Sequence, residues 1–453
     1  MRALQLGFAV LSVAACTVTE QLPTTTEVAS RADSVVRDLV ARDLFQGAAV
    51  IAHGDRVVYS AGYGWANREL QLPFTPDTPM DGASIAKTFT AAGLLLLSDE
   101  KRLDLNDPVA AYLSAFPYPN HRVIDLLTHA AGLPDYEWFD TLVVAGEPRT
   151  NDTHLGAMAQ RRPAPQFAPG TAFAYDNVAY DMAAMVIERV AGTSYAEFIS
   201  TRFARPLRLN TFVRPARFAD WVGARTRGYR RVPGGWELND AYDLEGFYGA
   251  DNIYVSAVDL QRWAAGYRGL MGEGPMRRAL TPGRLVDGSD TGISVGSWYV
   301  SADGAQRYYT GHHNGFYCIA YADDARNLSV AWVANDTPPV WLLSALPRAL
   351  IALAEGRDSE PLTPPPAADT LVNPTGRYDV PAVGEVVVER VGERLAVRVG
   401  GVQYQAFEVQ PGVHYLPGVD VALQFAVAAN GRVVMSWNSV YRRVPSVERR
   451  PAP

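Results

Sequence analysis

The sequence predicts an α+β fold in which both ends of a long first domain build one antiparallel sheet, followed by a small all-β domain. Strand-like runs occur near residues 48–61 and again at 292–333, and the chain between them spaces its apolar residues as helices do. A proline-rich stretch at 356–370 then leads into short alternating runs that continue to residue 447. This order favours a sheet covered by a helical cluster, with a barrel or sandwich behind it.

Length, composition and charge limit the function classes. A chain of 453 residues is too long for one ordinary core, so two globular domains are expected. With 48% hydrophobic and 20% charged residues, the chain has the profile of a folded protein rather than a disordered one. The net charge of -7 and the scattered arginines argue against a nucleic-acid partner, because no basic patch is present to neutralise phosphates.

The first residues are expected to be a targeting segment. Arg2 precedes an apolar stretch, Leu4 to Ala15, that is too short to span a bilayer, and small residues lead into Cys16. This pattern resembles the lipobox of bacterial lipoproteins, in which the cysteine is lipidated. It implies a signal peptide over 1–15, a polar tether over 16–28, and an exported, periplasmic or cell-surface protein that Cys16 anchors to the membrane. The alternative is an ordinary cleaved signal peptide with Cys16 incidental.

Cysteine and histidine usage gives no reason to expect a metal or another cofactor. The chain has 2 cysteines, so lipidation of Cys16 leaves Cys318 without a disulfide partner. The apolar neighbours of Cys318 indicate a buried core thiol. His312 and His313 resemble a metal pair, but adjacent residues on a strand point to opposite faces, and no acidic residue at ligand spacing accompanies them.

The expected first domain covers 29–355 and its elements follow from apolar spacing. A helix is predicted over 30–43, a hairpin over 48–61 and a helix from Ser84 to Ser98. Further helices are expected at 124–127, 178–190, 195–203 and 257–267, and strands at 292–300, 307–310, 316–321 and 329–333. The linker over 356–370 separates this domain from the all-β domain at 371–447, where Gly392-Glu393, Pro411-Gly412 and Asn430-Gly431 supply turns.

The first chemical motif is Ser84-Ile85-Ala86-Lys87. A serine at the start of a helix lies near free backbone N–H groups, and a lysine three residues later lies on the same helix face. Only two of the 41 basic residues are lysines, Lys87 and Lys101. Arginine supplies positive charge almost everywhere else, but only lysine can give up its proton and act as a base. The motif therefore predicts a serine nucleophile activated by an amine.

The second motif is Tyr175-Asp176-Asn177, which follows a Pro-Gly turn and precedes a helical stretch. A phenol beside a lysine can pass protons, and an amide two residues on can hold both the lysine and a substrate carbonyl. The same pattern recurs at Tyr118-Pro119-Asn120, which we interpret as a surface turn because prolines flank it.

The third motif is Tyr309-Thr310-Gly311-His312, on an expected strand. A glycine beside the nucleophile lets a substrate backbone approach closely, and the N–H that follows it can form an oxyanion hole with the N–H of Ser84. A competing pattern, Gly-x-Ser-x-Gly at 292–296, would need a strand-to-helix turn. A strand-like run follows it instead, so it is interpreted as a strand serine.

In this order the three motifs resemble the serine β-lactamase and penicillin-binding-protein superfamily, and their surroundings resemble its class C β-lactamase and family VIII esterase branch. Those surroundings include Gly132-Leu133-Pro134 and Gly249-Ala250-Asp251-Asn252. The tail is similar to the lipocalin-like barrel that some relatives append. The resemblance implies Ser84 as nucleophile, Lys87 and Tyr175 as the proton network, Asn177 as a substrate-binding residue, and the N–H groups of Ser84 and His312 as the oxyanion hole.

One departure from the family pattern affects the expected substrate. Relatives usually carry lysine or histidine where this chain has Tyr309, and that cation helps to bind the carboxylate of a β-lactam. We therefore expect a serine hydrolase that acts through an acyl-enzyme on small-molecule or peptide esters and amides, in preference to β-lactams. A non-hydrolytic penicillin-binding sensor is the alternative function. A weaker alternative makes the β-domain a partner-binding module.

Overall fold

The computed structural model describes residues 24–142, 149–213, 225–240, 246–364, 372–392, 394–417, 419–441 and 443–451. The described residues do not include Cys16, the predicted signal peptide or most of the predicted tether. They also leave out part of the predicted linker.

The helices and helical turns are α1 Thr25–Ala41, η1 Ala83–Ile85, α2 Ala86–Asp99, η2 Val109–Ala111, α3 Val123–Leu127, α4 Tyr136–Asp140, α5 Asn151–Arg161, α6 Asn177–Ala191, α7 Tyr195–Ile199, η3 Ser200–Ala204, α8 Arg205–Leu207, α9 Ala257–Met271, α10 Glu273–Leu280 and α11 Val340–Ala354. The strands of the first domain are β1 Gly47–His53, β2 Arg56–Tyr63, β3 Trp65–Asn67, β4 Leu72–Pro73, β5 Met80–Asp81, β6 Phe212–Val213, β7 Tyr229–Val232, β8 Gly235–Leu238, β9 Ile253–Val255, β10 Pro282–Arg284, β11 Asp290–Ser294, β12 Tyr299–Val300, β13 Gln306–His313, β14 Phe316–Asp323 and β15 Leu328–Ala334. The strands of the tail are β16 Gly376–Val380, β17 Gly384–Val391, β18 Arg394–Val399, β19 Val402–Gln410, β20 Val413–Leu416, β21 Val421–Val427, β22 Val433–Asn438 and β23 Arg443–Glu448.

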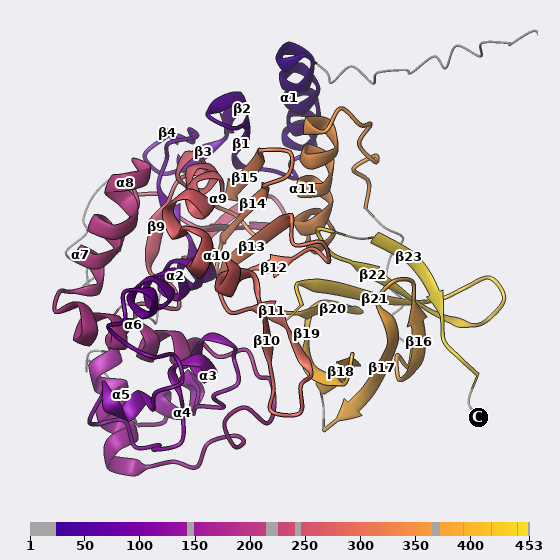
Figure 1. The fold of residues 1–453 in the computed structure, drawn as a ribbon. Coiled ribbons are helices and arrows are strands. Elements are labelled where there is room, and N and C mark those ends of the chain that lie inside the picture. Colours follow the sequence, from indigo (N-terminus) through magenta and orange to yellow (C-terminus); the bar gives the residue numbers. More distant parts are fainter. Residues whose placement is uncertain are drawn as a thin grey trace, which may run out of the picture.

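A six-stranded sheet in the order β12-β13-β14-β15-β1-β2 confirms that both ends of the first domain build one sheet. All of its neighbouring strands run antiparallel, and Ala49 of β1 pairs with Trp332 of β15. Helices α1 and α11 contact each other and the strands β2 and β15, whereas α9 packs against β1, β14 and β15 from the other side (Figure 1). Because helices cover both faces, β14 and β15 are buried along their whole length.

Two sequence expectations about the edges of the first domain need correction. The first helix begins at Thr25, inside the predicted tether, because Thr24 and Glu27 form a capping box before the apolar spacing starts. The expected strand over 292–300 is two strands in different sheets, β11 and β12, which are separated by a turn that contains Ser297 in the left-handed region at φ 59°. Ser294 ends β11 and no helix follows it, so the nucleophile-elbow reading stays rejected.

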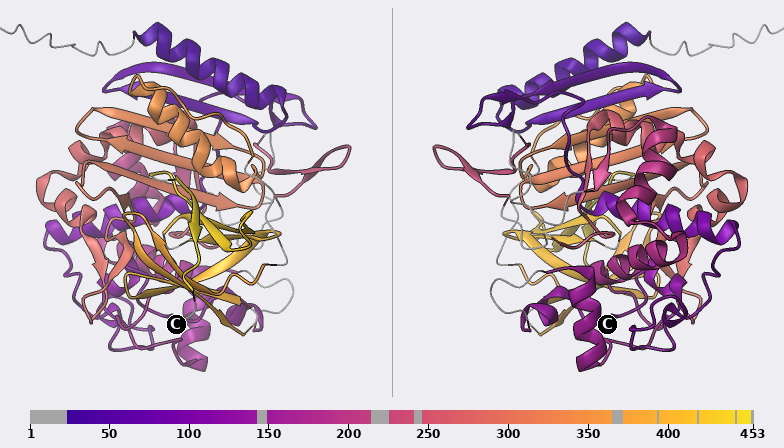
Figure 2. Two further views of the ribbon diagram at one scale, coloured as in Figure 1. Left: turned by 90° about the vertical axis from the view of Figure 1, so that its right-hand side faces the viewer. Right: turned by 90° about the vertical axis from the view of Figure 1, so that its left-hand side faces the viewer.

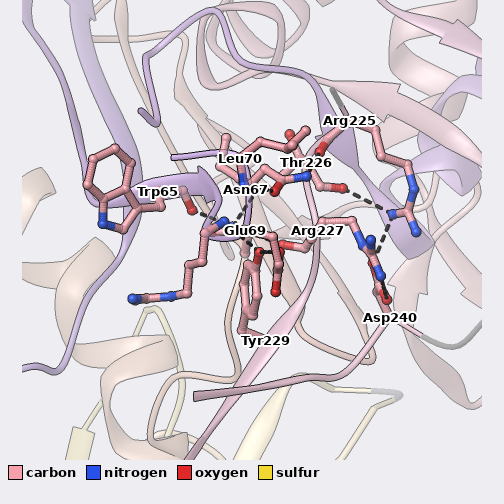
Figure 3. Close-up of polar contacts among 12 residues, drawn as sticks. Trp65, Asn67, Glu69, Leu70, Arg225, Thr226, Arg227, Tyr229 and Asp240 are labelled. Carbon is pink, nitrogen blue, oxygen red and sulfur yellow. Dashed lines mark hydrogen bonds and ion pairs between the residues drawn. The ribbon is translucent and has the colours of Figure 1, made fainter. Parts of the chain in front are cut away.

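The helical cluster packs below the sheet, with α6 against α2, α3 and α5 (Figure 1). A partly buried polar network ties the hairpin of β3 and β4 to the segment 225–240 (Figure 3). Asp240 pairs with both Arg225 and Arg227, and the Tyr229 hydroxyl donates to Glu69 at 2.7 Å. Neither segment has a long strand to hold it, so these side-chain bonds fix their positions.

The tail forms an eight-stranded sheet in chain order, β16 to β23, as the alternating pattern predicts. An antiparallel bridge between Tyr378 and Arg449 joins the first strand to the end of the last, so the sheet is a nearly closed barrel. It lies beside β12 and β13 of the first domain (Figure 2). The Tyr441 hydroxyl donates to the carbonyl of Tyr299 at 2.9 Å, and the Arg348 guanidinium donates to the carbonyl of Ser439.

None of the helices among the described residues is long and apolar enough to span a bilayer.

Candidate active site

Ser84 lies in a tight helical turn, Ala83–Ile85, that leads directly into α2. Two hydrogen bonds hold this turn, one to a residue just before it and one to the strand β9. The Asp81 carboxylate accepts the N–H of Ala83 at 2.8 Å, and the N–H of Gly82 donates to the carbonyl of Ile253 at 2.8 Å. Ala83 has a left-handed backbone at φ 45°, a conformation that costs free energy for a residue with a side chain and that the surrounding bonds impose.

Three side chains of the first two motifs meet at one oxygen atom. The Ser84 Oγ lies 3.0 Å from Lys87 Nζ and 2.8 Å from the Tyr175 hydroxyl. Ser84 and Tyr175 are half-buried, whereas Lys87 is fully buried. The Lys87 ammonium also lies 4.9 Å from the centre of the Tyr175 ring, within range of a cation–π contact. The structure therefore brings together Ser84, Lys87 and Tyr175, as the sequence predicts.

Lys87 has the right number of partners for both of its protonation states. Its Nζ lies 2.7 Å from Asn177 Oδ1 and 3.0 Å from the carbonyl oxygen of Ala250, in addition to Ser84. An ammonium donates three hydrogen bonds, which these three oxygens accept. A neutral amine donates only two, to Asn177 and Ala250, and its lone pair then faces the Ser84 hydroxyl. The amine can therefore take the serine proton without moving.

His129 fixes the position of Tyr175 from beneath. Its ring stacks on the Tyr175 ring at 4.6 Å. Its carbonyl accepts the N–H of Ala174, and its Nδ1 accepts the N–H of Asp176, each at 3.0 Å, so the residues on both sides of Tyr175 are tied to it. Burial, with Lys87 nearby, holds the pKa of His129 well below its usual value, so the ring stays neutral and Nδ1 remains an acceptor.

Gly311 has a different role from the one expected for it. A Cβ at this position would lie 2.0 Å from the carbonyl oxygen of Gly82, so glycine is needed for β13 to approach the turn that carries Ser84. The buried Cys318 thiol, opposite Gly311 on β14, donates to the same carbonyl at 3.3 Å. The missing side chain makes room for the protein's own backbone rather than for a substrate. The prediction of a core thiol at Cys318 is confirmed.

The remaining third-motif residues lie in three different environments. Tyr309 is buried, its hydroxyl lies 3.4 Å from that of Tyr175, and burial holds its pKa well above the usual range, so this position carries no charge. Thr310 is buried and its hydroxyl lies 3.4 Å from Asp420 Oδ1 in the tail barrel. His312 is exposed at the end of β13.

A cavity of about 520 Å³ adjoins this cluster, between the first domain and the barrel. On one side it is lined by the loop that carries Tyr175 and Asn177. On the other side it is lined by β18, β19 and Pro417 of the barrel. Phe173 of the first domain and Tyr404 of the barrel both line the cavity, and their rings pack edge to face with centroids 5.2 Å apart. The barrel is therefore a wall of the candidate active site and not a separate appendage.

Sequence reasoning missed three contributors to the site. Ala250 was visible only as part of the resemblance, because a backbone carbonyl has no signature of its own. No sequence motif connects His129 with Tyr175, and only the structure shows that their rings stack. Asp420 had no signal in the sequence.

Tyr118, from the second Tyr-x-Asn sequence, is not a surface residue as expected. Its ring is buried and its hydroxyl donates to the carbonyl of Pro163 at 2.8 Å.

Within the described ranges, no group of three or more histidine, cysteine, aspartate or glutamate side chains is placed to hold a metal ion.

Comparisons with known proteins agree with this geometry. The β-lactamase family profile matches residues 32–355. Penicillin-binding protein 4* of Bacillus subtilis (strain 168) is 31% identical over 167 residues, and the match spans only 37% of this chain and 37% of that protein. The octameric penicillin-binding protein homologue from Pyrococcus abyssi shares 22% identity and a TM-score of 0.61, covering 93% of this chain and 100% of that chain.

The D-amino acid amidase from Ochrobactrum anthropi SV3, solved with L-phenylalanine amide, shares 20% identity and a TM-score of 0.54, covering 68% of this chain and 91% of that chain. At these identities the solved structures establish a shared fold. The family profile covers more than half of the sequence and contains the Ser84, Lys87, Tyr175 and β13 motifs. The chain therefore belongs to the β-lactamase family.

Proposed function

We propose that this protein is a serine hydrolase that cleaves esters or amides through an acyl-enzyme on Ser84. The observation that carries the proposal is the position of the Ser84 Oγ, which lies within hydrogen-bond distance of both Lys87 Nζ and the Tyr175 hydroxyl. A serine hydroxyl becomes a nucleophile only when a base takes its proton. Lys87 is the neighbour able to do so while keeping its other two hydrogen bonds.

In the acylation step, the Ser84 Oγ attacks the substrate carbonyl carbon and its proton passes to Lys87. The carbonyl oxygen becomes an oxyanion, for which the N–H groups of Ser84 and His312 are the proposed donors. When the intermediate collapses, the bond to the alcohol or amine leaving group breaks. That leaving group takes up a proton from Tyr175, and the proton that Lys87 took from Ser84 passes to Tyr175 in turn, so both groups return to their starting state.

In the deacylation step, water attacks the acyl-enzyme carbonyl and gives its proton to the same pair. The bond between the acyl carbon and the Ser84 Oγ then breaks, and the serine recovers its proton. The Asn177 Oδ1 accepts a hydrogen bond from the Lys87 amine. The side-chain N–H₂ group of Asn177 is then free to donate a hydrogen bond to a carbonyl group of the substrate. No step requires a metal or an organic cofactor.

We infer that esters and amides are better substrates than β-lactams. The neutral, buried Tyr309 stands where relatives of this resemblance use a cation for the β-lactam carboxylate. The D-amino acid amidase with the same fold acts on amides, which supports this substrate class for the proposal. A hydrolase needs no anion-binding residue to accept an uncharged ester.

Intact-mass measurement with an aryl ester tests the proposal. We expect a transient acyl adduct and released phenol from the wild-type protein, with the adduct mapped to Ser84. The Ser84→Ala variant is the matched control and should show neither. A persistent adduct from a β-lactam, without ester turnover, would favour the non-hydrolytic sensor instead. An ester adduct that survives Ser84→Ala would contradict the proposal.

We also propose that the protein is exported and anchored through lipid on Cys16. The support is the pattern of Arg2, a short apolar stretch and small residues before Cys16. Labelling with a radioactive fatty acid in a bacterial host should mark the wild-type protein in the membrane fraction. The Cys16→Ala variant should carry no label, and equal labelling of both would refute the anchor.

A further inference from the structure

The turn between β20 and β21 of the barrel places a carboxyl group against the third-motif strand. Asp420 lies in this turn and is buried, with 7% of its surface exposed. Its Oδ1 lies 3.4 Å from the Thr310 hydroxyl of β13 and 2.6 Å from the hydroxyl of Tyr415. Pro417 in the same turn lines the cavity beside Tyr175. A group from the second domain thus lies directly behind the candidate active site.

Three hydroxyl groups surround the Asp420 carboxyl, and none of its described hydrogen-bond partners carries a positive charge. Tyr308, Thr310 and Tyr415 all supply hydroxyl hydrogen bonds to the carboxylate. Burial raises the pKa of Asp420 above its usual value, and these three hydroxyls oppose that shift. No ion pair joins Asp420 to a cation in the part of the chain that the structure describes. In its ionised form, Asp420 places an unpaired negative charge beside the cavity.

Other charges on the cavity wall have the same sign. Asp135, Glu137 and Asp176 line it, and Arg394 is the only basic residue among its lining side chains in the described chain. Asp176 is a helix cap whose pKa is raised to about 7 by burial, so its charge varies near neutral pH. The neutral Tyr309 adds no positive charge on the β13 side. Acidic side chains therefore outnumber basic ones in the cavity lining, and the main counterweight is the Lys87 amine, which lies behind Asn177.

We propose that Asp420 is a specificity-determining residue, supplied by the barrel, which makes the active site prefer acyl substrates carrying an ammonium group over those carrying a carboxylate. This inference rests on the proposed hydrolase activity of Ser84. The residue acts by its charge from behind the cavity wall and does not contact the reacting atoms. Removing the charge changes the preference between substrates and leaves the chemistry of Ser84 intact.

Three phenyl esters with para substituents of different charge measure this preference: the neutral para-ethylbenzoate, the cationic para-(aminomethyl)benzoate and the anionic para-(carboxymethyl)benzoate. At pH 8 the wild-type protein should show a kcat/KM for the ammonium ester at least about tenfold above that for the carboxylate ester. In the full-length Asp420→Asn variant this ratio should fall by about tenfold, while the neutral ester changes less than about threefold. The Glu389→Gln variant removes an exposed negative charge on β17 and should leave the ratio unchanged.

Each outcome separates the specificity inference from the proposed function. The neutral ester reports hydrolysis alone, so its failure to react would contradict the proposed function. A wild-type protein that hydrolyses all three esters without preference would overturn the role of Asp420, even if the variant did not fold. A parallel loss on all three esters in a folded Asp420→Asn variant, checked by its melting temperature, would also overturn it and assign the residue to structure.

Discussion

The candidate active site has two walls, and each holds a buried ionisable side chain without an ion-pair partner among the described residues. Lys87, in the first domain, faces three oxygen acceptors. Asp420, in the barrel, faces hydroxyl donors. Lys87 touches the candidate nucleophile, whereas Asp420 reaches the site only through Thr310 and the turn around Pro417. One wall therefore contains the proposed catalytic groups, and the proposed role of the other is to set the charge around them.

The different partners of Lys87 and Asp420 also affect which protonation states each side chain can adopt. Every partner of Lys87 suits both an amine and an ammonium, so the lysine can change its proton count during a reaction. The hydroxyl partners of Asp420 favour the carboxylate and oppose the rise in its pKa that burial causes. A substitution in the first wall should therefore alter rate, and one in the second should alter preference.

The largest expected effect comes from Lys87→Arg. Arginine keeps the positive charge but cannot accept the serine proton, so acylation by an aryl ester should fall by about 10³-fold or more. Lys101→Arg is the matched control, because Lys101 is the other lysine of the chain and is exposed on the surface. Stopped-flow release of the phenol measures both variants. Wild-type turnover in Lys87→Arg would remove the lysine from the proton network.

A smaller loss is expected for Tyr175→Phe. The ring and its stack on His129 remain, but the hydroxyl 2.8 Å from the Ser84 Oγ is lost, so kcat should fall by about 10²-fold. Tyr118→Phe provides the comparison, since it removes a buried tyrosine hydroxyl from the other Tyr-x-Asn sequence. It should cost about 1 kcal/mol in free energy of unfolding and leave kcat unchanged. Equal kcat losses in both would contradict the assignment of Tyr175.

His154 shows what happens when a buried ionisable group lacks partners. Neither ring nitrogen has a hydrogen-bond partner among the described residues, and burial, with Arg149 nearby, lowers its pKa to about 4. The unfolded chain binds a proton near pH 6.5 but the native ring stays neutral, so native stability falls as pH drops from about 6.5 towards 4. The His154→Leu variant should lose about 2 kcal/mol less free energy of unfolding than wild type between pH 7 and pH 5.

Urea unfolding of the two proteins at both pH values measures that difference. An identical decrease in both would show that the ring of His154 does not titrate differently in the native and unfolded states.

The smallest effect is expected for Tyr415→Phe, which removes the 2.6 Å donor to Asp420 while keeping the ring. The ratio of ammonium to carboxylate ester hydrolysis should change by about threefold, with the neutral ester unaffected. Tyr415 is thus a positioning residue for the charge of Asp420. A change in the neutral ester of the same size would indicate a general disturbance of the barrel turn.

The first wall was largely predictable because its residues come from short local patterns. Ser84 and Lys87 lie one helical turn apart, and Tyr175 and Asn177 lie at the entry to a helix. The sheet was also predictable, because apolar runs at both ends of the domain need a common layer to bury them. Helix α11 was missed: it contains Pro347 and is buried along most of its length, so it shows no amphipathic pattern.

By itself, the sequence was enough to single out Ser84, Lys87, Tyr175 and Asn177 as candidate site residues and to predict the order of two folded units. Only the tertiary structure decided that Gly311 makes room for the Gly82 carbonyl, that His129 holds Tyr175, and that Asp420 lies against Thr310. The physical reason is separation along the chain. Spacing within one helix fixes which side chains share a face, but a contact between β13 and a turn 110 residues later depends on how two domains pack.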